Sequence, residues 1–268
     1  MIDGVAGLYD ALHAFESRFR RGAAYPVHKN LKFSDPEIAD IYDWIITGVG
    51  LPDGGAILDA GCGVGFGTIR MANRSSSQVT GISISPAEIA TATRTAAESM
   101  AGNRLAFAVG SFDQPLAGPF ALITAVESLK HSADLATTLN MLFAALQPGG
   151  TIVIVDDCYS GPADDEDAVQ LCEAWKLVKL YSESDFSAWP DSVHCDVISL
   201  DECLAFKTAL SRTRRRLGSL LRPLFSASIP SPVAAAFRGG RCLERLYGRG
   251  LMQYTAIIAH YKGVANHL

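Results

Sequence analysis

The chain has 268 residues, of which 49% are hydrophobic, and a formal net charge of −5. A chain of this size and hydrophobic content can bury a sizeable core, which excludes long disordered spans. The acidic balance also argues against nucleic acid as a partner, because phosphate contacts require a basic surface.

The N-terminal residues 1–21 mix charged and apolar side chains and lack the continuous apolar core of a signal peptide. No stretch approaches the length of a membrane-spanning helix, so we expect no membrane insertion. Six cysteines show no paired Cys-x-x-Cys spacing, which argues against a zinc site or a disulfide framework and predicts a cytoplasmic protein. The oligomeric state stays open, a homo-oligomer included.

Residues 1–50 carry apolar side chains at helical spacing, at Leu8, Leu12 and Phe15 and again at Ile41 and Ile45. From Ala56 onward, short apolar runs alternate with helical patterns, which predicts an α/β fold with a mostly parallel sheet covered on both faces. The predicted strands are 56–60, 78–83, 104–109, 120–126, 150–156 and 252–261, and the predicted helices lie near 65–74, 86–101 and 132–147. A strand expected before the last one cannot be placed.

The first strand ends at Asp59 and breaks into the turn Gly61-Cys62-Gly63-Val64-Gly65. Glycines let this backbone adopt dihedral angles closed to other residues and let a ligand approach. A dinucleotide fingerprint needs its third glycine where Phe66 stands, and a phosphate-binding P-loop needs a Gly-Lys-Ser/Thr ending that is absent.

This apolar strand with its acidic end and glycine turn resembles the first motif of class I methyltransferases that use S-adenosylmethionine (SAM). Pro148-Gly149-Gly150 before an apolar strand also resembles that family, so the similarity covers residues 56–157. The resemblance implies a Rossmann-like fold with SAM as cofactor, a helical cap over residues 1–50, and a methyltransferase domain over residues 51–268. Within that domain it implies a lid at about 158–202, followed by an arginine-rich C-terminal part.

The resemblance also implies which residues hold SAM. Gly61, Gly63 and Gly65 would make room for its methionine part, and Asp59 would receive the methionine amino group, directly or through water; the glycines beside Asp59 favour this role over a turn cap. Ser83 stands where many members bind the ribose hydroxyls. Glu88 either binds ribose or begins a helix, where acidic residues suit the helix dipole.

After the third strand, Gly110 stands where the family commonly has the aspartate that binds adenine. Ser111 and Phe112 offer a hydroxyl, a backbone N–H and an aromatic face instead, so we expect them at the adenine. Phe112 is equally suited to the hydrophobic core.

The segment Glu127-Ser128-Leu129-Lys130-His131 resembles that of natural-product O-methyltransferases. It implies that His131 is the general base for a hydroxyl acceptor on a small specialised metabolite, with Asp156 as its acidic partner. An imidazole with an ordinary pKa would make activity rise with pH.

Three alternatives stay open. Glu127 could stabilise a carbocation or remove a proton in an isoprenoid C-methyltransferase, with the arginine-rich segment binding a diphosphate. Ten basic and three acidic residues give residues 201–250 a net charge of +7 and leave −12 elsewhere, but such a segment is more often a solvated helix face than a phosphate site. The chain could also be a SAM-fold partner protein without catalysis.

Overall fold

A computed structural model of the protein describes residues 2–16, 28–205 and 231–262. Its centre is a seven-stranded sheet in the order β3-β2-β1-β4-β5-β7-β6. The strands are β1 (Ala56–Ala60), β2 (Gln78–Ser83), β3 (Leu105–Val109), β4 (Phe120–Val126), β5 (Leu146–Tyr159), β6 (Val193–Ser199) and β7 (Met252–Tyr261). The first five are parallel, whereas β7 is antiparallel to β5 and β6. The predicted α/β fold is confirmed.

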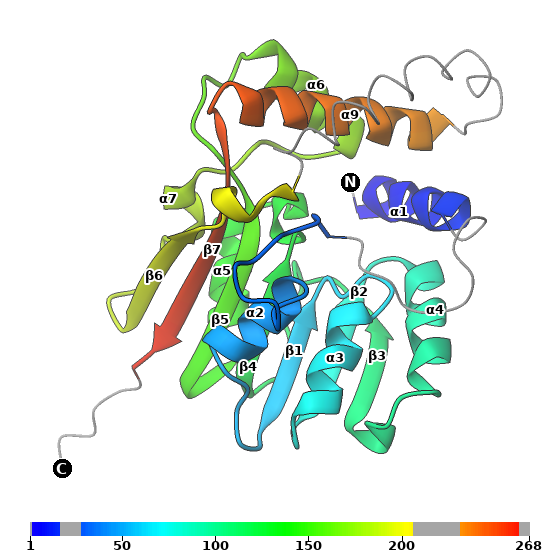
Figure 1. Ribbon diagram of the computed structural model, residues 1–268, viewed down its shortest axis with the longest axis vertical. Helices are drawn as coiled ribbons and strands as arrows, with labels where there is room; N and C mark the ends of the chain where they lie inside the picture. The colour runs from blue at the N-terminus through cyan, green and yellow to red at the C-terminus, as the bar shows by residue number, and fades with distance from the viewer. Residues whose placement is uncertain (1, 17–27, 206–230, 263–268) are drawn as a thin grey trace.

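The helices connect and cover these strands (Figure 1). They are α1 (Ile2–Glu16), α2 (Ile41–Gly48), α3 (Phe66–Arg74), α4 (Pro86–Ala96), α5 (Leu135–Ala144), α6 (Glu166–Trp175), α7 (Glu183–Phe186) and α9 (Ser231–Gly248), with short 3₁₀ turns η1 (Gly102–Arg104), η2 (Leu129–His131) and η3 (Asp201–Cys203). No helix in the described ranges is both long and apolar enough to cross a bilayer.

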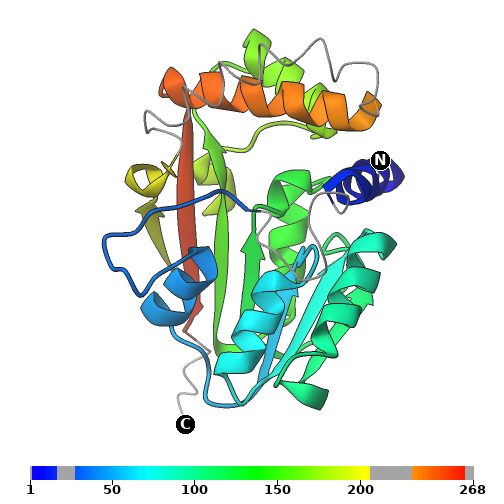
Figure 2. The same ribbon diagram turned by 45° about the vertical axis from the view of Figure 1, so that its right-hand side comes forward.

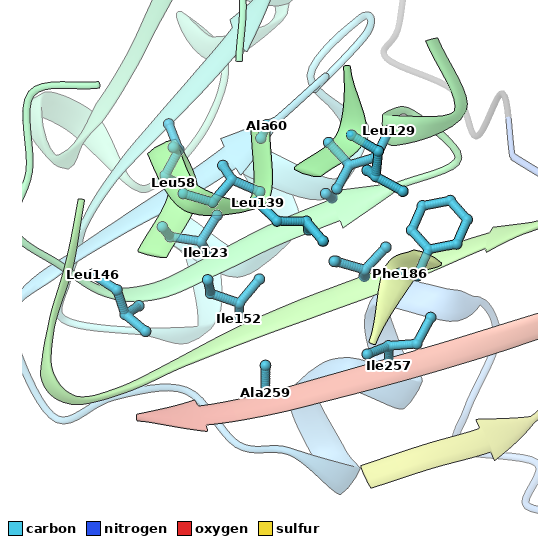
Figure 3. Packing of buried hydrophobic residues seen from close by; sticks show 14 of the residues in the cluster. Leu58, Ala60, Ile123, Leu129, Leu139, Leu146, Ile152, Phe186, Ile257 and Ala259 are labelled. Atoms are coloured by element: carbon cyan, nitrogen blue, oxygen red, sulfur yellow. The ribbon is translucent and has the colours of Figure 1, made fainter. Parts of the chain in front are cut away.

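The two faces of the sheet bury two separate hydrophobic clusters, because successive strand side chains point to opposite faces. Leu58 joins the cluster that includes Leu139 of α5, as Figure 3 shows from close by. Ile57, the next residue along β1, joins the cluster that includes Ile45 of α2 and Met71 of α3. Continuous apolar runs such as β4 therefore follow from burial on both faces.

A third hydrophobic cluster joins α6 to α9 beyond the carboxyl ends of the central strands. Figures 1 and 2 show α9 lying across this end of the molecule, with α1 between it and the ends of β1 to β3. Phe15 of α1 contacts Phe237 of α9, with ring centroids 6.2 Å apart. Segments distant in sequence therefore cover the same edge of the sheet.

Several boundaries differ from those expected. The strand that could not be placed is β6, an edge strand whose residues are mostly exposed, so it lacks a strong apolar pattern. β5 begins at Leu146, before Pro148, because an irregularity in its pairing with β4 and the positive φ of Gly149 (80°) carry the strand past the turn. Helix α4 ends at Ala96, short of residue 101.

Residues 158–202 contain the end of β5, α6, α7 and β6, so part of this segment belongs to the sheet itself. Its role as a lid, and that of residues 1–50 as a cap, remain predictions. Arg212 to Arg222 lie outside the described residues. Arg245 of α9 and Arg249, just after its end, pair with Asp165 and Asp167 at the start of α6, so these two arginines join the helices.

A buried carboxylate joins α2 to α3. Asp43 accepts hydrogen bonds from Arg70 and Arg74. Burial opposes its charge, but these guanidinium groups lower the pKa of Asp43 to about 2, from an ordinary value of 3.8. A lowered pKa contributes stability above pH 3.8 that is lost as pH falls towards 2.

We therefore expect Asp43→Asn to lower the free energy of unfolding by about 1–2 kcal/mol at pH 7, after allowance for the partly exposed arginines. The difference from wild type should shrink between pH 4 and pH 2. Urea unfolding followed by circular dichroism measures both, with the exposed Asp53→Asn as control. A deficit that stays constant down to pH 2 would contradict this assignment.

Candidate active site

A cavity of about 360 Å³ lies at the carboxyl ends of β1, β2 and β4. Its inner wall comes from the loops that follow these strands, and its outer wall from α1, α6 and α9. In an open parallel sheet this edge is where ligands bind. The sequence-predicted residues that border the cavity are Gly61, Gly63, Ser83, Glu88, Phe112, Glu127 and His131.

The glycine turn after β1 is required by packing as well as by ligand access. Gly61 and Gly65 have φ of 88° and 83°, a region that favours glycine. A Cβ atom on Gly61 would lie 2.3 Å from the Cβ of Ser128, and one on Gly65 would lie 2.7 Å from the ring of Phe107. Gly65 does not border the cavity. Gly61 therefore makes room for the loop after β4, not only for a ligand.

Asp59 is fully buried and does not border the cavity. Its carboxylate accepts hydrogen bonds from the hydroxyls of Thr68 (2.6 Å), Thr124 (3.0 Å) and Tyr42 (3.2 Å). Burial raises its pKa despite these bonds. Tyr42 of α2, whose hydroxyl donates to Asp59, borders the cavity, whereas Asp59 does not. The contact of Asp59 with the methionine amino group remains a prediction.

Glu88 begins α4, and its place at the ribose remains a prediction with which its position is compatible. Its backbone N–H donates to Ser85 Oγ, the N-cap of α4, and its side chain is buried and borders the cavity. Ser83 donates to Glu88 Oε2 at 2.7 Å. A buried carboxylate with a hydroxyl beside it suits the two hydroxyls of a ribose.

The loop after β3 borders the cavity through Gly110 and Phe112. Phe112 also packs against the core cluster on the α5 face, so the core interpretation is confirmed, and its contact with adenine remains a prediction. Ser111 does not border the cavity, and its hydroxyl accepts the N–H of Asp113 at 3.0 Å. A Cβ on Gly110 would meet nothing closer than 3.8 Å, which leaves space for a ligand.

These residues fit SAM. The glycine turn, the Glu88 carboxylate and the Phe112 ring follow three neighbouring strands and border one cavity, in the order that methionine, ribose and adenine require. When bound there, SAM supplies a methyl group on a sulfonium centre.

His131, in η2, is a half-buried residue whose Nδ1 is shielded from solvent. Its Nε2 lies 2.7 Å from the hydroxyl of Tyr9, and its Nδ1 has no hydrogen-bond partner among the described residues. Burial, assisted by the charge of Lys130, lowers the pKa of His131 to about 3. The imidazole is therefore neutral at physiological pH.

Glu127 follows β4 with a φ of 52°, in a region that few residues other than glycine adopt. Its Oε1 accepts the backbone N–H of Lys29 (2.6 Å) and the hydroxyl of Tyr254 (2.9 Å). Burial opposes its charge, but Lys29 and Lys130 lower its pKa. Glu127 is thus an ionised carboxylate that its neighbours already neutralise.

Asp156 does not contact His131. It accepts the backbone N–H of Lys130 at 3.0 Å and pairs with the Lys130 ammonium at 3.1 Å. The same ammonium lies 2.9 Å from Asp157, which also pairs with Lys29 at 2.8 Å. We call these five residues, Lys29, Glu127, Lys130, Asp156 and Asp157, the buried ionic network.

Sequence reasoning missed the residues that the N-terminal region brings to the cavity, chiefly Tyr9, His28 and Tyr42, and also Lys130 and Trp175. Tyr9 lies one position after Leu8 in the helical apolar pattern, which carries no sign of its contact with a loop more than a hundred residues away. Lys130 stands in the segment Glu127 to His131 that the sequence analysis singled out, but its spacing gives no sign of the carboxylates that surround it.

Comparisons with known proteins agree with this geometry. Residues 51–216 match the family model described as "Methyltransferase domain". The chain is 27% identical over 286 residues to the probable chloroplastic tocopherol O-methyltransferase of Oryza sativa subsp. japonica, an alignment covering 95% of this chain and 77% of that protein.

Two solved structures share the fold. The [4+2]-cyclase SpnF has a TM-score of 0.71 and 18% identity, covering 96% of this chain and 94% of that chain. Geranyl diphosphate C-methyltransferase from Streptomyces coelicolor A3(2), in complex with Mg²⁺, geranyl-S-thiolodiphosphate and S-adenosyl-L-homocysteine, has a TM-score of 0.71 and 16% identity, covering 97% of both chains.

Because the family model matches more than half of the chain, the chain belongs to the methyltransferase domain family. It is a class I SAM-dependent enzyme that methylates a small molecule. This assignment removes the alternative of a partner protein without catalysis.

The role of Gly61 in packing predicts a specific loss of stability. We expect Gly61→Ala to lower the free energy of unfolding by about 2–4 kcal/mol, from backbone strain plus the collision with Ser128. Gly50→Ala is a matched control, since Gly50 has a φ of 89° and open space around it, and should cost only about 1 kcal/mol. Equal losses in urea unfolding would show that the contact with Ser128 is unimportant.

The position of Glu88 predicts a specific loss of SAM affinity. Glu88→Gln keeps an acceptor for Ser83 but removes the charge from the hydrogen bonds to a ribose, so we expect the dissociation constant for SAM to rise about tenfold or more. Titration calorimetry measures this directly. The exposed Glu98→Gln is the control, and an unchanged constant in Glu88→Gln would remove Glu88 from the cofactor site.

Proposed function

We propose that this enzyme transfers the methyl group to a hydroxyl oxygen of a small specialised metabolite, with His131 as the proton acceptor. The observation that supports this most is that His131 is a neutral, half-buried imidazole that borders the cavity, with a hydroxyl already hydrogen-bonded to its ring. A neutral imidazole can take a proton at once.

His131 and Glu127 differ in how far their neighbours neutralise them, and this difference bears on which of them can accept a proton. The carboxylate of Glu127 pairs with two ammonium groups and accepts two further hydrogen bonds. A carboxylate in that state has little remaining capacity to take a proton or to stabilise a cation. This supports His131 as the proton acceptor and Glu127 as the residue that positions the loop after β4.

The low pKa of His131 is compatible with this role. As a hydroxyl oxygen bonds to a methyl group, it gains positive charge and its proton becomes strongly acidic. A base with a pKa near 3 then suffices, provided that proton transfer accompanies or follows formation of the C–O bond. Asp156 supports the site indirectly, by holding the backbone N–H and the ammonium of Lys130 next to His131.

The cavity wall supports an organic acceptor, and the cysteines support a reducing compartment. The outer wall of the cavity is apolar, with Leu8 and Leu12 of α1, Trp175 of α6 and Phe237 of α9, which suits the body of an organic metabolite. All six cysteines are free thiols, which supports a reducing compartment such as the cytoplasm.

C-methylation of an isoprenoid is the second candidate, because Glu127 is ionised and borders the cavity. In that reaction the carboxylate of Glu127 would stabilise a carbocation or remove a proton. Arg215 and Arg216, which would bind a diphosphate, lie outside the described residues. The paired state of Glu127 makes this the weaker proposal.

Two variants decide between the candidates. The protein is first incubated with SAM labelled in its methyl group and a panel of hydroxylated aromatics, aliphatic alcohols and isoprenoid diphosphates. With the acceptor so identified, His131→Ala should lower kcat by about 10²- to 10⁴-fold while SAM affinity stays nearly unchanged. Glu127→Gln should lose far more activity than His131→Ala if the C-methylation alternative holds. A fully active His131→Ala enzyme would overturn the proposed mechanism.

The pH profile is a second test. Because the pKa of His131 lies near 3, we expect kcat to show no rise near pH 6.5 and to stay level from pH 5 to 8, unlike an enzyme whose base has an ordinary imidazole pKa. This replaces the expectation from sequence that activity rises with pH. A rise centred near pH 6.5 that is absent from His131→Ala would contradict the burial argument.

A further inference from the structure

Neither ring nitrogen of His131 is open to the cavity. Nε2 lies 2.7 Å from the hydroxyl oxygen of Tyr9, with the two rings edge to face and their centroids 5.3 Å apart. Nδ1 has almost no accessible surface and no partner among the described residues. Tyr9 itself borders the cavity. A molecule held in the cavity therefore reaches His131 through Tyr9.

Chemistry fixes the direction of the hydrogen bond between Tyr9 and His131. Burial raises the pKa of Tyr9 above its ordinary value, so its hydroxyl keeps its proton. A phenol is a stronger acid than a neutral imidazole N–H, and an imidazole nitrogen is a better acceptor than a phenol oxygen. The Tyr9 hydroxyl therefore donates to Nε2, and the single proton of the neutral imidazole lies on Nδ1.

We propose that Tyr9 is a catalytic residue that carries the proton of the acceptor hydroxyl to Nε2 of His131, an inference that rests on the proposed O-methylation. The acceptor O–H donates to the free lone pair of the Tyr9 oxygen. As the acceptor oxygen forms its bond to the methyl carbon, the carbon–sulfur bond breaks and its electron pair stays on sulfur. The acceptor proton moves to Tyr9 while the Tyr9 proton moves to Nε2. Tyr9 ends neutral, and His131 ends as an imidazolium.

The contacts of α1 give Tyr9 a defined position for this transfer. Asp10, the next residue, accepts a hydrogen bond from Ser85 Oγ at the start of α4, and His13 hydrogen-bonds Thr91 on the same helix at 2.9 Å. Leu8 is buried on the cavity side. The helix that carries Tyr9 is thus fixed to the segment that also presents Glu88.

The first test needs no acceptor. We would label the full chain with ¹⁵N-histidine, record long-range ¹H–¹⁵N spectra at neutral pH, and assign His131 with His131→Ala. Wild type should show the Nδ1–H tautomer, and Tyr9→Phe should shift the population towards Nε2–H. Tyr181→Phe is the matched control, since it removes a hydroxyl that donates to the Ser132 carbonyl beside His131, and should leave the tautomer unchanged. An Nε2–H tautomer in wild type, or no change in Tyr9→Phe, would overturn the assignment.

The second test uses the acceptor identified by the screen above. Tyr9→Phe should lower kcat by about 10- to 100-fold with KM changed less than about threefold, and should alter the solvent deuterium isotope effect on kcat. Tyr181→Phe should change neither. An unchanged or raised kcat in Tyr9→Phe would mean that the acceptor displaces Tyr9 and meets His131 directly, which would overturn the proposal.

The two tests separate this inference from the proposed function. If no hydroxyl compound accepts the methyl group, O-methylation fails, whereas the tautomer result still decides whether Tyr9 controls His131. If hydroxyl methylation is found with His131→Ala inactive and Tyr9→Phe fully active, the proposed function stands and the role of Tyr9 fails.

Discussion

The site depends on burying the ammonium group of Lys130. An uncompensated charge at this depth would be prohibitively costly, and removing one partner of a buried pair typically costs about 3–5 kcal/mol. Burial opposes the charge of Lys130, but Asp156, Asp157 and Glu127 together raise its pKa well above its ordinary value. The need to satisfy this ammonium holds the loop after β4 against the end of β5. That loop carries both candidate catalytic side chains, Glu127 and His131, so their positions follow from the buried ionic network.

The same network joins two segments outside the sheet, the one that carries Lys29 and helix α9, to the end of β5. Lys29, on the segment after the N-terminal helix, pairs with Asp157 and donates its backbone N–H to Glu127. Tyr247, near the end of α9, donates its hydroxyl to Asp157. Two elements more than two hundred residues apart thus converge on one carboxylate at the end of β5. Moving either element away from the sheet would therefore break a charged hydrogen bond.

Local pattern was sufficient for the strands of the sheet and for most of the helices, because β4 and its neighbours are buried on both faces and carry continuous apolar runs. It was also sufficient for the glycine turn and for the start of α4 at Glu88, whereas the contact of Glu88 with ribose remains a prediction. It failed for β6, whose exposed edge position leaves no apolar run, and for the partner of His131. The resemblance to O-methyltransferases implied Asp156 as that partner, but the carboxylate of Asp156 pairs with Lys130 instead. The partner that a carboxylate chooses among nearby groups depends on side-chain geometry. Sequence spacing carries no information about that geometry.

The charge balance of the network suits a reaction in which a positive charge moves from the sulfonium of SAM to the imidazole of His131. Glu127, Asp156 and Asp157 face two ammonium groups, so one negative charge is in excess when Asp156 is ionised. Burial raises the pKa of Asp156, which means that this excess charge is costly in the absence of a further cation. Under the proposed mechanism a cation is present throughout, first as the sulfonium in the cavity and then as the imidazolium of His131. Each would reduce the cost of ionising Asp156, although the ammonium of Lys130 opposes the charge of the imidazolium. A neutral hydroxyl acceptor preserves this balance, whereas an anionic acceptor would add to the excess negative charge.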